Sequence, residues 1–101
     1  MYKLYLDDER EAPKDWIRCY WPNQVIDLMK LLTHRVSEIS LDHDLGNDGK
    51  GTGYDVLTWI EEQVHTQSNF HVPMIHIHTA NPSARQRMLA AYKAILKHRN
   101  F

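Results

Sequence analysis

The sequence predicts an α/β protein with three layers, in which a four-stranded, mostly parallel sheet lies between helices. Two observations support this class. Short apolar runs alternate along the chain with segments whose apolar residues recur at helical spacing. Helices that connect strands in this way imply a parallel sheet with helices on its faces. A chain of 101 residues is near the usual size for one hydrophobic core, so we expect a single domain over residues 1–101.

The first part of the chain predicts two short strands and a helix. Residues 2–6 form an apolar and aromatic run that ends at a group of charged residues. A loop containing proline follows, and residues 16–20 form the second run. Apolar residues at helical spacing then predict a helix over residues 24–32. Asn23 is a suitable N-cap for that helix.

The second part of the chain alternates between strand and helix twice. Strands are predicted at residues 36–41 and 70–78. Between them, residues 54–64 carry one apolar face at helical spacing. The last helix is predicted over residues 83–99, where basic residues near its end interact favourably with the helix dipole.

The composition indicates a soluble globular protein, with 43% hydrophobic and 25% charged residues. A net charge of −1 supplies no overall positive field, so neither double-stranded DNA nor an anionic membrane is an expected partner. The chain lacks an apolar run of the ~20 residues that a membrane span needs, and its N-terminus lacks the apolar core of a signal peptide. We therefore expect a cytoplasmic protein. The single cysteine, Cys19, excludes an internal disulfide and is expected to be a packed thiol.

Polar side chains follow three of the predicted strands where each strand ends. In an open parallel sheet, ligands bind beyond the carboxyl ends of the strands, so these groups are expected to meet at one edge. The alternative for each group is a turn or a cap, because aspartate suits both. The three groups are Asp7-Asp8-Glu9-Arg10, Asp42-His43-Asp44 and His78-Thr79-Ala80-Asn81.

Carboxylates that are brought together repel one another, and a divalent cation relieves that repulsion. Oxygen ligands suit magnesium, calcium or manganese, and added histidines shift the preference toward manganese, iron or zinc. A histidine beside a carboxylate is also a candidate general acid or base. His76 is predicted to be a hydrogen-bonded core histidine, although it shares a strand face with His78, which leaves a histidine pair open. The other histidines outside these groups are expected at the surface.

Several of these motifs resemble the response-regulator receiver domain: YLDDER after the first strand, LDHDLG after the third, and a threonine after the fourth. The resemblance implies that Asp7 and Asp8 match the acidic pair that holds magnesium, Asp42 the phosphoacceptor, and Thr79 the switch hydroxyl. Residues 7–16 are too few for the first receiver helix, and no lysine matches the one that contacts the phosphoryl group. The expected fold is thus receiver-like, or flavodoxin-like, with the first helix and the fifth strand missing.

The set LDDER, SLDHDLG, GTGYDVLTW and HTANP resembles more closely the cyclic-phosphate-processing receiver-like family, a trimmed derivative of the receiver domain, over nearly the whole chain. This resemblance implies a metal-assisted site that acts on the cyclic phosphate of a nucleotide or of an RNA end. The site residues that it carries over are Asp7, Asp8, Asp42, His43, Asp44, His78 and Asn81, with Arg85 as a further contributor.

The leading hypothesis is a phosphoesterase that opens a cyclic phosphodiester. In this hypothesis Asp7, Asp8 and Asp42 hold magnesium, manganese or zinc. His43, His78 and Asp44 form the acid–base machinery. Residues around the start of the last helix hold the phosphate, as helix N-termini readily do. The phosphate-binding candidates are Arg10, Thr79, Asn81 and Arg85.

Two alternatives remain open at this point. In the first, Asp42 is a nucleophile that forms a phosphoenzyme, as in receivers. In the second, the protein has no catalytic activity and either sequesters a cyclic nucleotide or docks a partner protein as a degenerate receiver. The ring that is opened, the base, the metal and the oligomeric state also stay open.

Overall fold

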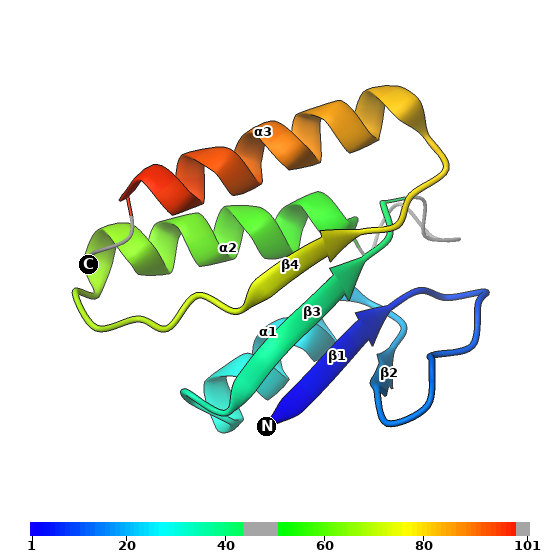
Figure 1. The fold of residues 1–101 in the computed structure, drawn as a ribbon, viewed down its shortest axis with the longest axis horizontal. Helices are drawn as coiled ribbons and strands as arrows, with labels where there is room; N and C mark the ends of the chain where they lie inside the picture. The colour runs from blue at the N-terminus through cyan, green and yellow to red at the C-terminus, as the bar shows by residue number, and fades with distance from the viewer. Residues whose placement is uncertain (44–50, 99–101) are drawn as a thin grey trace.

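The computed structural model describes residues 1–43 and 51–98. Along this part of the chain (Figure 1), a sheet of four strands alternates with helices, in the topology β2-β1-β3-β4 with every neighbouring pair parallel. The α/β class and the strand number agree with the prediction. The elements are β1 (Tyr2–Leu6), β2 (Ile17–Cys19), α1 (Pro22–Leu31), β3 (Val36–Leu41), α2 (Gly53–Thr66), β4 (Met74–Ile77) and α3 (Pro82–His98).

The helices α1, α2 and α3 pack side by side on one face of the sheet, so the fold has two layers where three were predicted. α1 contacts α2, and α2 contacts α3; Figure 1 shows α1 behind β1 and β3. The strand residues that face the helices are buried: Leu4 pairs with Ile39, Ile39 pairs with Ile75, and none is more than 5% exposed. Residues from all three helices complete this single core.

The handedness of the connections explains this one-sided packing. The connections from β2 to β3 and from β3 to β4 both move across the sheet in the same direction. Because such crossovers are right-handed, both of their helices fall on the same face. The connection from β1 to β2 moves in the opposite direction, and a helix there would cover the other face. Residues 7–16 form a loop at that position, so no helix among residues 1–43 and 51–98 covers it.

The other side of the sheet is here called the helix-free face. Trp16 covers part of it: its ring packs edge-on against Tyr5 and against His76, with centroids 6.2 Å apart in each case. A tight turn brings Trp16 back over the strands, since its N–H donates to the carbonyl of Pro13 and Asp15 has φ 71°. Residues on this face alternate with the core residues of the same strands; they are Lys3, Tyr5, Glu38, Ser40, Met74 and His76.

The prediction that His76 is a core residue was wrong. Its side chain is 45% exposed and its Nε2 lies 2.9 Å from Oε1 of Glu38. His76 and Lys3 together hold the pKa of Glu38 below its ordinary value. The strand alternation places His76 on the helix-free face, where no helix is available to bury it.

Several element boundaries differ from the prediction by a few residues, and two of these differences have a clear local cause. β4 begins at Met74 rather than at residue 70, and Pro73, which has no N–H to donate, comes directly before it. α1 begins at Pro22, with Trp21 and not Asn23 as its N-cap. The side chain of Gln24 explains this start, because its Oε1 accepts the N–H groups of Tyr20 and Trp21. Within the described ranges, none of the helices has the length and apolar character to cross a membrane.

The buried thiol of Cys19 generates a prediction about chemical reactivity. Cys19 is 1% exposed, and burial raises the pKa of its thiol to about 11. Because the thiolate is the reactive form, the native protein should resist a thiol reagent such as DTNB at pH 8, and unfolding in guanidinium should release one equivalent of reactive thiol. Rapid labelling of the native protein would contradict the packing described here.

A second prediction concerns Gly53, where α2 begins against the exit of β3. A Cβ at this position would overlap the backbone carbonyl of Asp42 and touch Met88. Gly53→Ala should therefore lower the free energy of unfolding by about 1–3 kcal/mol, measured by urea denaturation. Thr58→Ala, at an exposed position of the same helix, is the control and should change stability by no more than about 0.5 kcal/mol. Equal effects of the two substitutions would contradict the close approach.

Candidate metal and phosphate site

The carboxyl ends of β1, β3 and β4 lie next to one another at one edge of the sheet (Figure 1). The backbone hydrogen bonding continues for one residue beyond these strands. The N–H of Asp42 donates to the carbonyl of Leu6 at 3.0 Å, and the N–H of His78 donates to that of Leu41 at 3.0 Å. On the other side of β1, the N–H of Asp7 donates to the carbonyl of Cys19. The first residue after each strand is therefore held as firmly as the strand itself.

Asp7, Asp42 and His78 come together at this edge. Each offers one metal-ligating atom, and these atoms all lie within 4.8 Å of one another. The three predicted groups of polar residues thus converge, as the parallel sheet requires. All three side chains belong to the helix-free face, because they continue the alternation of Tyr5, Ser40 and His76.

The carboxylate of Asp7 is buried and fixed in orientation. Its side chain is 1% exposed, and its Oδ1 accepts the N–H groups of Glu9 at 2.8 Å and Arg10 at 2.9 Å. The other oxygen, Oδ2, lies 3.2 Å from Nε2 of His78. Burial alone would raise the pKa of Asp7, but the two backbone donors and His78 outweigh it and hold the pKa below its ordinary value. The group is therefore a carboxylate at neutral pH.

His78 is held from three sides. Its Nδ1 lies 2.7 Å from the hydroxyl of Ser40, its Nε2 contacts Asp7, and its ring stacks on Tyr5 with centroids 4.5 Å apart and planes 3° apart. Burial lowers the pKa of His78, and the hydrogen bond to Asp7 and the charge of Asp42 only partly oppose this. The ring is therefore neutral at pH 7. A neutral imidazole is the form that binds a metal or accepts a proton.

Asp42 presents the second carboxylate of the group and is half-buried. Its Oδ1 accepts the backbone N–H of His43 at 2.8 Å. His43 is half-buried as well. Both carboxylates thus use Oδ1 to accept backbone donors, which fixes the direction in which Oδ2 points.

Asp8 and Asp44 are the other acidic residues that the sequence predicted for this site, and the structure describes only Asp8. Asp8 is half-buried and directly follows Asp7, but the group of ligating atoms found among the described residues consists of Asp7, Asp42 and His78. The prediction for Asp44 falls on a residue outside the described ranges.

Two of the predicted phosphate-binding residues are arginines, and both reach the exit of β4. Nη1 of Arg10 donates to the carbonyl of His78 at 3.1 Å. Nη1 of Arg85 donates to the carbonyl of Ile77 at 2.8 Å. Two guanidinium groups from distant parts of the chain therefore flank this edge of the sheet.

The other two phosphate-binding candidates organise the connection from β4 to α3. The hydroxyl of Thr79, which is 7% exposed, accepts the N–H of Asn81 at 3.2 Å. Oδ1 of Asn81 accepts the N–H of Ala84 at 3.1 Å, as an N-cap residue does. The side-chain oxygens of both residues thus hold the turn that leads into α3.

Sequence reasoning missed Tyr5 and Ser40, which position His78. A signal for them was present. In a strand, residues two apart share a face, so the residue two positions before each candidate lies beside it on the sheet. Tyr5 precedes Asp7 in this way, and Ser40 precedes Asp42.

A family comparison covers the segment that contains this site. The model of one protein family, described as the cyclic-phosphate processing receiver domain, matches residues 2–94. The comparisons with curated proteins and with solved structures gave no match. The family match spans most of the chain and includes every candidate site residue from Asp7 to Arg85. The chain therefore belongs to the cyclic-phosphate processing receiver domain family.

Proposed function

We propose that the protein hydrolyses a cyclic phosphodiester, in a nucleotide or at an RNA end, with the help of a divalent metal ion. The observation that carries this proposal is the convergence of Asp7, Asp42 and His78, whose ligating atoms lie within 4.8 Å of one another. The description of the family supports a cyclic phosphate as the class of substrate.

The donor set of the site fits a divalent ion. Asp7 and Asp42 each have one oxygen fixed by backbone N–H groups, which orients the other without any cost at the moment of binding. Asp8, next in the chain, is the third carboxylate of this proposal. Two or three carboxylates suit magnesium or manganese, and zinc also binds carboxylate oxygens. Such an ion supplies charge for the phosphoryl oxygens and acidifies a bound water.

His78 is the residue proposed to take the proton of the attacking water. In the structure, Nε2 of His78 faces Oδ2 of Asp7 at 3.2 Å as a donor would, so an ion held by Asp7 would have to replace this contact. To accept the water proton at Nε2, the neutral ring must then carry its own proton on Nδ1. The hydroxyl of Ser40 supports this tautomer, since its oxygen lies 2.7 Å from Nδ1 and can accept a hydrogen bond as well as donate one. The charges of Asp7 and Asp42 by themselves favour protonated His78, and an ion held by these carboxylates would weaken that effect.

The bond changes of the proposed reaction are those of a simple hydrolysis. The water oxygen forms a bond to phosphorus as its proton passes to His78, and the bond from phosphorus to one ring oxygen breaks. His43, held beside Asp42 by the backbone, is the proposed acid for that leaving oxygen. Arg10 and Arg85 flank the exit of β4 and would neutralise the phosphate. Asn81 and Thr79, at the start of α3, are the remaining proposed phosphate contacts.

Metal binding is tested by thermal stability. Manganese or zinc should raise the melting temperature, since an ion at a hundred times its dissociation constant stabilises the native state by about 2.7 kcal/mol. Asp42→Asn should abolish this shift while the metal-free protein still melts cooperatively. Glu62→Gln removes an exposed carboxylate from α2 and should leave the shift unchanged. An Asp42→Asn protein that responds to metal as the wild type does would exclude this metal site.

Catalysis is tested with a panel of 2′,3′- and 3′,5′-cyclic nucleotides and RNA ends that carry a 2′,3′-cyclic phosphate. With metal present, one class should give product. His78→Gln should lower kcat by about 10²-fold or more, because a general base contributes on this scale. Ser40→Ala should lower kcat less, since it removes only the group that orients the base.

His76→Gln is the matched control for these substitutions. His76 lies on the same face as His78 and two residues before it, but it bonds Glu38, so His76→Gln should retain wild-type turnover. Equal turnover by His78→Gln and wild type would refute the role of His78. Binding of a cyclic nucleotide without product at any metal would favour the sequestering module instead.

A further inference from the structure

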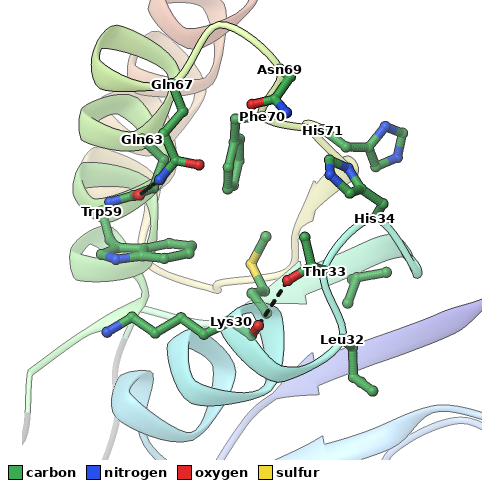
Figure 2. Close-up of a pocket in the computed structure, with 12 residues that line it drawn as sticks. Lys30, Leu32, Thr33, His34, Trp59, Gln63, Gln67, Asn69, Phe70 and His71 are labelled. Atoms are coloured by element: carbon green, nitrogen blue, oxygen red, sulfur yellow. Dashed lines mark hydrogen bonds between the residues drawn. The ribbon is translucent and has the colours of Figure 1, made fainter.

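A pocket lies at the opposite edge of the sheet from Asp7, Asp42 and His78. It has a volume of about 380 Å³, within the range of roughly 300–1,000 Å³ that is typical of small-molecule sites. Figure 2 shows it between the ends of α1 and α2 and the segment that leads into β4. Val36, the first residue of β3, lines this pocket, whereas Asp42 follows the last residue of the same strand. The two sites are therefore separated by the length of a strand, on the order of 15–20 Å.

Aromatic rings form one side of the pocket. Trp59 of α2 and Phe70 are both half-buried, and their rings pack edge-to-face with centroids 5.7 Å apart and planes 79° apart. Both rings border the hollow in Figure 2. The buried side chains of Met29 and Val36 add apolar surface to the lining. Such a surface favours a planar ring, which stacks on aromatic side chains.

The polar side chains that line the pocket are either basic or uncharged. Lys30, His34 and His71 belong to this lining, and none of the described residues that line the pocket is an aspartate or a glutamate. The carboxamides of Gln63 and Asn69 lie at the rim and can both donate and accept hydrogen bonds. A ligand that fits this lining carries a hydrogen-bonding edge and a negative charge.

The backbone conformation of His34 determines where its side chain lies. His34 follows the end of α1 with φ 64°, a left-handed conformation that usually belongs to glycine or asparagine at a helix C-terminus. Histidine, like asparagine and aspartate, is one of the non-glycine residues that adopt this conformation most often. It places the imidazole at the pocket, 6.5 Å from the ring of His71.

We propose that this pocket binds a mononucleotide, with the base against Trp59 and Phe70 and the phosphate near His34 and His71, which lie across the hollow from the Lys30 side chain. A mononucleotide combines the three features that the lining selects, namely a planar ring, a hydrogen-bonding edge and an anion. The site goes beyond the proposed hydrolysis at the other edge of the sheet and does not depend on it.

The probe is a titration of the ¹⁵N-labelled full chain with AMP, GMP, CMP and UMP, followed by NMR. Adenosine, which lacks the phosphate, and ribose 5-phosphate, which lacks the base, are titrated in parallel. Chemical-shift changes should be largest at residues 29–36 and 59–71. Each of the two smaller compounds should bind at least about tenfold more weakly than AMP. Changes confined to the neighbourhood of Asp7, Asp42 and His78 would overturn the proposal, as would equal binding of ribose 5-phosphate and AMP.

Substitutions then identify the contacts. Trp59→Leu should weaken AMP binding about tenfold, because it removes the stacking surface. His71→Ala, at an exposed position of the lining, should weaken AMP binding about fivefold or more and leave adenosine binding unchanged. Tyr20→Leu removes an exposed aromatic ring that lies outside the pocket and should have no effect on either ligand.

His34→Gly separates function from stability. Glycine adopts φ 64° without strain, so this protein should melt at or above the wild-type temperature while binding AMP more weakly. Asp42→Asn should abolish hydrolysis of cyclic phosphates but leave the shift changes at residues 59–71 intact, which distinguishes failure of one site from failure of the other. Wild-type affinity in His34→Gly, or loss of AMP binding in Asp42→Asn, would overturn the proposal.

Discussion

The handedness of the strand connections is the constraint on which the rest of this structure depends. Two right-handed crossovers in the same direction place α1 and α2 on one face of the sheet, and α3 packs beside them. The short connection after β1 contains no helix, so the opposite face stays accessible and is only partly covered by Trp16. Polar side chains can therefore line a sheet face that is buried in a three-layer fold. The proposed catalytic group is the continuation of that face beyond the strands.

The site combines two charged carboxylates with a neutral imidazole, and the backbone makes this combination stable. Asp7 is buried, yet its pKa is lowered, because the N–H groups of Glu9 and Arg10 point at its oxygen. His78 is half-buried, and its pKa is lowered for a different reason, since desolvation disfavours its charged form. One edge of a small sheet thus keeps an anion and a neutral base 3.2 Å apart. This pairing suits a site that binds a cation and then moves a proton.

The same chain carries different chemistry at its two edges. At the carboxyl edge the side chains are carboxylates, an imidazole and two arginines that bond backbone carbonyls. At the amino edge the pocket is aromatic, and none of the described residues that line it is an acid. The position of α2 explains this contrast, because the helix begins against Asp42 at one edge and presents Trp59 and Gln63 at the other. The two ligands proposed here would therefore bind at separate surfaces of a two-layer domain.

The amino-acid sequence by itself determined the class of the fold, the parallel direction of the strands, and the groups that lie at the exits of β1, β3 and β4, because periodicity and strand-end residues are local signals. It also pointed to Asp7, Asp42 and His78, since parallel strands place their carboxyl ends together. Only the tertiary structure decided that the helices share one face, because layering depends on the direction of each crossover across the sheet. Because the helices share one face, His76 lies at the surface rather than in the expected core, and Tyr5 and Ser40 contact His78 on the helix-free face. Contacts between residues as distant as Ser40 and His78 arise from strand register, which no local pattern in the sequence specifies.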